Sequence, residues 1–321
     1  MKSSDLDCAA AERRIRPYVI ETPVTSSRWL SALSGAQVYL KLENLQETGA
    51  FKLRGATHKL FSLTPAQASR GIVTASSGGN HALGVAATGS KLGIATEVFV
   101  PSTIDPARRE KIEALGARVR LVDGDSLLAE QTARREGERS GREYASPYND
   151  PEVIAGQGTI AVELLRQLPR LDAVFVAVGG GGLIGGIGAH LKVASPGTEV
   201  VGCWPRNSRA LYECIRAGHV MEVAEQPTLS VSTAGGVEEN AITLPLCSEV
   251  IDRSVLVSEE EILDSLRRLY REDQQLVEGA AAVPVAAFRQ VADDYAGKTV
   301  AIILCGGNVG AQIVAMIKQV Q

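Results

Sequence analysis

The chain alternates short apolar, β-branched segments with longer segments in which apolar residues recur every three or four positions. This alternation is typical of α/β proteins, in which helices link the parallel strands of a sheet. In the first half of the chain, the pattern predicts strands at 71–76, 95–101 and 118–123, alternating with helices at 80–92, 105–117 and 126–141. These segments predict a small α/β block of roughly a hundred residues, a usual size for a domain.

A second series of the same kind begins near Tyr144. It predicts helices at 158–169, 182–195 and 258–273, and strands at 172–178, 198–205 and 297–308. We therefore expect two open, mostly parallel sheets with flanking helices. The small domain would span 46–145, and the large domain would combine 1–45 with 146–321. Ligands of such sheets bind beyond the carboxyl ends of the strands, so the cleft between the domains is the expected site.

Composition narrows the class of protein further. The 321 residues are 45% hydrophobic and 22% charged, with a net charge of −4 and no basic block, which argues against a nucleic-acid partner. No apolar run is long enough to span a bilayer. The five cysteines and four histidines are scattered without metal-ligand spacing, so we expect reduced thiols, no metal site and a cytoplasmic location.

The strongest local feature is a run of four glycines between an apolar strand and a helix, Gly179, Gly180, Gly181 and Gly182. Free backbone amides at a helix N-terminus bind phosphate, whereas the plainer alternative is a tight turn. Gly180, Gly182 and Gly185 also fit a dinucleotide fingerprint, which requires an acid after the next strand. That strand ends at Cys203 and Trp204 instead, so a small phosphate carried by a cofactor fits better.

A second turn follows the first strand of the small block and contains Ser76, Ser77, Gly78, Gly79 and Asn80. Serine and asparagine are good helix N-caps, which would explain the turn without any ligand. The same hydroxyls and amides could instead bind a carboxylate, and the Asn80 amide could donate to an anionic ring oxygen.

Two single residues have both structural and chemical interpretations. Lys52 lies between Phe51 and Leu53, where it is either a surface lysine with a buried stem or an amine held in a dry pocket to form a Schiff base. Cys305 ends the last strand, where it is either a buried structural cysteine or a thiol that faces the ligand.

Six motifs in order make the chain closely resemble the fold-type II pyridoxal-phosphate enzymes, in the branch of threonine/serine dehydratases and serine racemase. The motifs are KLENLQETGAFKLRGA, SSGGNHALGVA, PEVIAGQGTIAVELL, VGGGGLIGGI, LVEGAAAV and LCGGNVG. The resemblance covers essentially the whole chain. It implies a fold like that of the tryptophan synthase β subunit, with the active site in the interdomain cleft, and a homodimer.

The resemblance also implies roles for individual residues. Lys52 would carry pyridoxal 5'-phosphate as a Schiff base, Phe51 would lie against its ring, and Asn80 would bond its 3-hydroxyl oxygen. The phosphate would be held by Gly179, Gly180, Gly181, Gly182 and Leu183, with Cys305 facing the pyridine nitrogen and Glu278 near the ring. The substrate carboxylate would be bound by Ser76, Ser77, Gly78, Gly79 and Asn80. By the same resemblance Glu47, Arg54 and His81 are scaffold residues.

The implied reaction is the dehydration and deamination of a 3-hydroxy-L-amino acid to a 2-oxo acid and ammonia. Lys52 would remove the α-proton, and the cofactor phosphate or a nearby acid would assist the departing hydroxyl group. The main alternative is an amino-acid racemase with Ser77 as its second base. A β-replacement synthase and a non-catalytic regulatory module are more distant alternatives.

The chain departs from the family pattern at three positions. Racemising members place a serine directly before the Gly-Asn-His motif, where this chain has Gly78, which favours dehydration. Trp204 replaces a glutamate of the metal-activated members, which argues against a divalent-cation site. Gly235 stands where many relatives have aspartate, so we expect a bulkier or less polar substrate. These features are similar to those of a subgroup linked to phenylserine or to hydroxyectoine utilisation.

Overall fold

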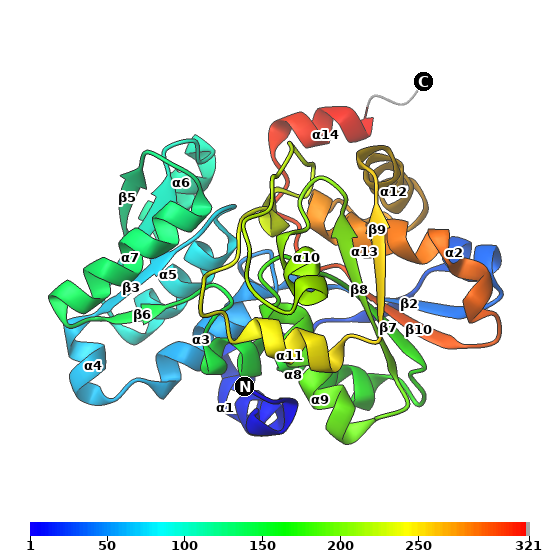
Figure 1. Cartoon of the computed structure of the whole chain (residues 1–321), viewed down its shortest axis with the longest axis horizontal. Coiled ribbons are helices and arrows are strands. Elements are labelled where there is room, and N and C mark those ends of the chain that lie inside the picture. The colour runs from blue at the N-terminus through cyan, green and yellow to red at the C-terminus, as the bar shows by residue number, and fades with distance from the viewer. Residues whose placement is uncertain (319–321) are drawn as a thin grey trace.

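The computed structural model describes residues 1–318, in which ten strands form two separate sheets (Figure 1). The larger sheet has the strand order β1-β2-β10-β7-β8-β9, and the smaller sheet has the order β5-β4-β3-β6. All neighbouring strands are parallel except β1 and β2. The predicted fold class of two mostly parallel sheets with flanking helices is therefore confirmed.

The strands of the larger sheet are β1 Val24–Ser26, β2 Gln37–Lys41, β7 Ala173–Ala177, β8 Glu199–Pro205, β9 Arg253–Val257 and β10 Thr299–Ile303. Its helices are α1 Cys8–Ile15, α2 Arg28–Ser34, α8 Pro151–Gln167, α9 Gly182–Ala194, α10 Ala210–Ala217, α11 Thr243–Val250, α12 Glu259–Glu272, α13 Gly279–Gln290 and α14 Ala311–Lys318. The smaller block contains β3 Ile72–Ala75, β4 Thr96–Pro101, β5 Arg118–Val122 and β6 Glu143–Ala145, with helices α3 Lys52–Ser62, α4 Pro65–Arg70, α5 Asn80–Leu92, α6 Pro106–Ala114 and α7 Ser126–Ser140.

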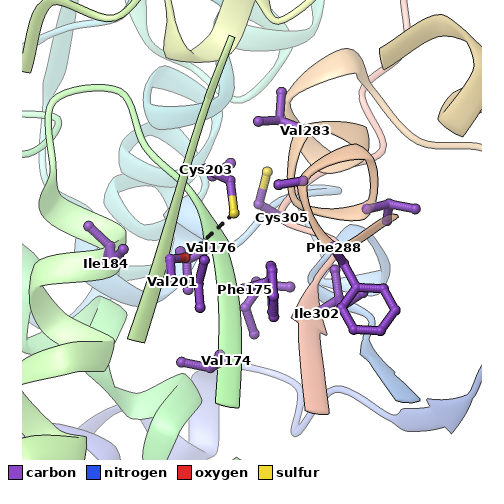
Figure 2. Close-up of a cluster of buried hydrophobic side chains, with 14 of the residues drawn as sticks. Val174, Phe175, Val176, Ile184, Val201, Cys203, Val283, Phe288, Ile302 and Cys305 are labelled. Carbon is purple, nitrogen blue, oxygen red and sulfur yellow. Dashed lines mark hydrogen bonds between the residues drawn. The ribbon is translucent and has the colours of Figure 1, made fainter. Parts of the chain in front are cut away.

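The core of the larger block lies between the central strands and α13. Because parallel strands are covered on both faces, β7 and β10 are buried along their whole length. Phe175 of β7 meets Phe288 of α13 edge to face, with ring centroids 5.3 Å apart. Figure 2 shows Cys203 and Cys305 at one end of this cluster and Val174 at the other. This core fixes the strand ends from which the glycine turns project.

The helix α3 connects the two blocks. It packs against α5 of the smaller block and against α8 of the larger one. All four strands of the smaller sheet lie within 46–145 and all six of the larger sheet lie outside it. The domain boundaries themselves stay a prediction, because α3 belongs by its contacts to both blocks.

The structure lengthens one predicted helix considerably. The sequence predicts a helix at 158–169, but α8 begins at Pro151, where the side chain of Asp150 accepts hydrogen bonds from the amides of Glu152 and Val153. Gly156 interrupts the apolar pattern of the first two turns. A Cβ at Gly156 would lie 2.6 Å from the Cα of Gly55, so close packing against α3 requires glycine there.

Candidate active site

The candidate active site is a pocket at the carboxyl ends of β3, β7 and β10, between the two sheets. Its lining comes from both blocks of the structure, a position typical of sites for small molecules. The pocket brings together nearly all residues singled out from the sequence: Phe51, Lys52, Ser76, Ser77, Gly78, Asn80, Gly179, Gly180, Gly181, Gly182, Leu183, Glu278 and Cys305. Gly79 lies just outside its lining, at the N-cap of α5.

Lys52 is the first residue of α3, and its ammonium group lies inside the pocket. Its Nζ donates a hydrogen bond to the carbonyl oxygen of Pro147 at 2.6 Å and lies 5.2 Å from the centre of the Phe51 ring. Burial lowers the pKa of Lys52 to about 8, and the nearby acidic groups only partly oppose this shift. The amine is therefore ready to lose its proton near neutral pH, as Schiff-base chemistry requires.

The four-glycine turn forms a cradle of backbone amides between β7 and α9. Gly181 has a φ of +89°, which favours glycine, and α9 begins at the next residue. A Cβ at Gly180 would overlap the ring of Tyr148, so a larger residue would fill the cradle. Amides at a helix N-terminus favour an anion because the helix dipole adds to their hydrogen bonds. The turn therefore fits the phosphate of a small cofactor.

The loop before α5 is held in one conformation by a left-handed glycine and a hydrogen bond within the loop. Gly79 has a φ of +88°, and its amide donates to the Oγ of Ser76 at 3.0 Å. Across the pocket, Ser232 places its Oγ 3.0 Å from where a Cβ at Gly78 would lie. A hydroxyl group thus lies beside Gly78 although the loop itself lacks a serine there.

Asn80 and Glu278 form one hydrogen-bonded unit on the pocket wall. The Nδ2 of Asn80 donates to both carboxylate oxygens of Glu278, at 2.9 and 3.0 Å. Its Oδ1 accepts from the Nδ2 of Asn308 at 2.9 Å. Burial raises the pKa of Glu278, and the hydrogen bonds from Asn80 work against that shift. Glu278 thus orients the Asn80 amide inside the pocket.

Cys305 follows β10 and presents a thiol to the pocket. Burial raises the pKa of this thiol well above its ordinary value, and the nearby Glu278 adds to the shift. The backbone oxygen of Cys305 accepts from the amide of Phe51 at 3.0 Å. The turn after β10 and the start of α3 are therefore held together, and the side chain that faces the pocket here is neutral.

The pocket also contains Glu130, Tyr148 and Ser232, which the sequence analysis did not single out, and His81, which it assigned to the scaffold. Burial lowers the pKa of His81 to about 3, so its imidazole is neutral, and it contacts the carbonyl oxygen of Ala145 at 3.2 Å. Glu130 and Tyr148 lie outside any glycine turn and carry no motif of their own. The only available signal for Glu130 was a carboxylate on the more apolar part of the 126–141 helix.

Arg54, which the sequence analysis assigns to the scaffold, lies in a buried ion cluster behind the pocket. Its guanidinium pairs with Glu43 at 2.8 Å and with Glu163 at 2.7 Å, and Lys41 pairs with Glu163 at 2.6 Å. The cluster joins the first turn of α3 to α8 and to the end of β2. It therefore fixes the position of Lys52, two residues before Arg54.

Fold and site together define an enzyme that binds pyridoxal phosphate, and comparison with known proteins gives the same result. Residues 15–306 match the family model for pyridoxal-phosphate dependent enzymes, and the chain belongs to that family. Its fold is that of the fold-type II members, as the resemblance predicts.

Relatives with named activities are similar to this chain over nearly its whole length. The chain is 38% identical to an L-threonine ammonia-lyase of Thermotoga maritima over 96% of this chain and 76% of that protein. It is 35% identical to a β-hydroxyaspartate dehydratase of Paracoccus denitrificans, covering 94% and 95% of the two chains. The structure of maize serine racemase superposes with a TM-score of 0.89 and 30% identity, covering 96% and 94%. These relatives are dehydratases or racemases that share the family's cofactor.

Two features that other functions would require are absent from the described residues. Within residues 1–318, no helix has both the length and the apolar character needed to cross a membrane. In the same part of the chain, no three His, Cys, Asp or Glu side chains gather as they would around a metal ion.

Proposed function

We propose that this enzyme is an ammonia-lyase that dehydrates and deaminates a 3-hydroxy-L-amino acid of the phenylserine, threonine or serine class. The observation that carries the proposal is Lys52, an amine of lowered pKa between the glycine cradle and the thiol of Cys305. Its products would be a 2-oxo acid and ammonia, formed through a Schiff base at Lys52. The named activities of the relatives support the same reaction class.

The residues present fit the cofactor. Gly179, Gly180, Gly181, Gly182 and Leu183 would hold its phosphate, Phe51 and Asn80 would contact its ring and ring oxygen, and Cys305 would face its ring nitrogen. When bound, pyridoxal phosphate supplies an electron sink for the α-carbon of the substrate. A neutral thiol at Cys305 cannot keep the ring nitrogen protonated as a carboxylate would. This favours early loss of a group from the β-carbon over long-lived delocalisation of charge.

The chain's own groups have defined tasks in this proposal. The amine of Lys52, with a pKa near 8, accepts the α-proton of the substrate, since a base works best when its pKa lies near the working pH. The hydroxyls of Ser76 and Ser77 and the amide of Gly78 bind the substrate carboxylate, while Gly79, whose amide donates to the Oγ of Ser76, keeps the loop in shape. The Glu278–Asn80 unit keeps the Asn80 amide aimed into the pocket.

The charge of the pocket supports a neutral substrate side chain. Among the described residues that line the pocket, Lys52 is the only lysine or arginine, and Glu130 and Glu278 are acidic. Arg108, behind Gly78, already donates to the carbonyl oxygens of Gly78 and Asn308, so a second substrate carboxylate would find no free cation among the described pocket residues, and burying it unpaired would be costly. We therefore expect serine, threonine or 3-phenylserine to react faster than 3-hydroxyaspartate.

A racemase is the second candidate, because Ser232 supplies a hydroxyl beside Gly78, where racemising relatives carry a serine. Ser77 is the other candidate for the second base. Racemisation requires a group that returns the proton on the opposite face of the α-carbon, so the chirality of unreacted substrate tests this alternative.

The test uses purified, cofactor-loaded protein given serine, threonine, threo-3-phenylserine and 3-hydroxyaspartate in separate assays. Oxo acid and ammonia from one of the first three, lost in Lys52→Ala, are the expected result. Inversion of substrate without ammonia would replace the lyase by the racemase.

The homodimer, the cytoplasmic location and the 45/46 and 145/146 domain boundaries belong to the same proposal. Light scattering of the purified protein tests the dimer.

A further inference from the structure

Helix α7 contributes to the pocket a carboxyl group that the proposed chemistry has not used so far. Glu130 is buried and lines the pocket together with Lys52 and Tyr148. Its Oε2 is out of contact with water and has no hydrogen-bond partner among the described residues. The phenol of Tyr148, which accepts a hydrogen bond from the amide of Glu238, lines the same pocket. Glu130 is thus a buried pocket residue with an unpartnered carboxyl oxygen.

The surroundings of Glu130 leave it without a counter-ion. Arg134, one turn further along α7, donates instead to both carboxylate oxygens of Glu238, at 2.8 and 2.9 Å. Asn149 also donates to Glu238, at 2.6 Å, and the amide of Glu238 donates to the Tyr148 hydroxyl at 3.0 Å. Glu238 is therefore the carboxylate that pairs with Arg134, while Glu130 remains buried near Glu238.

This arrangement favours the protonated form of Glu130. Burial raises its pKa to about 8, the charge of Glu238 adds to the shift, and Lys52, Tyr148 and Arg134 oppose it. Tyr144 faces the same group with its own phenol protonated. At neutral pH, Glu130 is therefore a carboxylic acid with a proton to donate, next to the amine that removes protons.

We infer that Glu130 is the acid that protonates the departing β-hydroxyl group of the substrate, an inference that rests on the proposed function. The bond between the β-carbon and oxygen breaks, its electron pair leaves on oxygen, and the proton of Glu130 joins that oxygen to form water. The electron pair of the α-carbon–hydrogen bond becomes the new carbon–carbon double bond, and its proton resides on Lys52. Transfer of that proton from Lys52 to the Glu130 carboxylate restores both groups.

The other ionisable groups of the described pocket are less suited to this step. Both oxygens of Glu278 accept hydrogen bonds from Asn80. The imidazole of His81 is held neutral, with its Nε2 against a backbone carbonyl. The thiol of Cys305 and the phenol of Tyr148 have pKa values well above their ordinary range.

The test compares leaving groups in Glu130→Gln, which keeps the shape and hydrogen-bonding capacity of the side chain but carries no acidic proton. General acids contribute about 100- to 10,000-fold, so we expect kcat for the hydroxy amino acid to fall by at least about 100-fold. Chloride leaves without a proton, so elimination from 3-chloro-L-alanine should change less than about threefold. Glu138→Gln, an exposed residue of the same helix, is the matched control and should leave both activities unchanged.

A second readout does not depend on activity. Infrared difference spectra of the cofactor-free protein at pH 6 and pH 10 should show a protonated carboxyl group that is missing in Glu130→Gln. Equal losses for the hydroxyl and chloride substrates, or no such carboxyl signal, would overturn the role of Glu130. A wild-type enzyme that eliminates chloride but dehydrates no hydroxy amino acid would instead overturn the proposed function.

Discussion

At the scale of single residues, the predictable part of the site is the part built from backbone. Glycine and serine turns at strand ends are visible in the sequence because few residue types adopt positive φ or leave amides free. The structure accordingly brings the 76–80 and 179–182 turns into one pocket. Glu130 and Tyr148 were not predictable from the sequence. Their importance depends on burial and on the pairing of Glu238 with Arg134 and Tyr148, and no local sequence pattern indicates these contacts.

The lowered pKa of Lys52 predicts unusual reactivity in the cofactor-free protein. With a pKa of about 8, roughly a tenth of this amine is neutral at pH 7, whereas an ordinary lysine is neutral to only about one part in three thousand. Lys52 should therefore be labelled first by a small acylating reagent at pH 7. Peptide mass spectrometry measures the order of labelling, with exposed Lys2 as the reference. Equal labelling of the two lysines would contradict a desolvated Lys52.

At the scale of elements, the sequence predicts β3, β4, β5, α5, α6 and α7 of the smaller block to within a few residues, because each is amphipathic or β-branched and bounded by turn residues. It does not predict α3, α4 or β6. Helix α13, which packs over β7 and β8, was missed. It is buried nearly throughout and rich in alanine, so it has no polar face and no helical periodicity to read.

The junction of β7 and α9 offers a test of the phosphate cradle. Gly180→Ala places a methyl group against the Tyr148 ring and into the cradle, so we expect cofactor affinity to fall at least about tenfold. Gly197→Ala is the matched control, because a Cβ there meets no atom within 4 Å. Titration of the cofactor-free proteins with pyridoxal phosphate, followed by absorbance, measures both dissociation constants. Unchanged affinity in Gly180→Ala, with circular dichroism like that of the parent, would exclude the cradle as the phosphate site.

At the scale of the whole molecule, helix α3 is tied to the larger block behind the pocket by the buried cluster of Arg54, Lys41, Glu43 and Glu163. Burial alone would raise the pKa of Glu163, but the hydrogen bonds and charges of Arg54 and Lys41 hold it at about 2. The sequence shows each of these residues but not their convergence. Their spacing of more than a hundred residues, from β2 to α8, is set only by the packing of α3.

The cluster predicts a specific loss of stability in acid. A carboxylate whose pKa falls from 4.5 in the unfolded chain to about 2 in the folded one stabilises the fold above pH 4.5, by about 3 kcal/mol. This contribution is lost as the pH falls from 4.5 towards 2. Glu163→Gln, which leaves Arg54 and Lys41 without a carboxylate, should lower the free energy of unfolding by about 3–5 kcal/mol at pH 7.

The comparison that decides the role of the cluster is the pH dependence, because a mere packing defect would shift stability equally at every pH. Urea unfolding at pH 7 and at pH 3 should give a large difference between parent and Glu163→Gln at pH 7 and a smaller one at pH 3. Glu138→Gln, on the solvent side of α7, should follow the parent at both values. Because α3 starts at Lys52 and carries Arg54 one half-turn later, loosening the cluster should also raise the pKa of the Lys52 amine toward its ordinary value. A Glu163→Gln protein with undiminished selective labelling of Lys52 would show that the cluster stabilises the fold without setting the environment of the active amine.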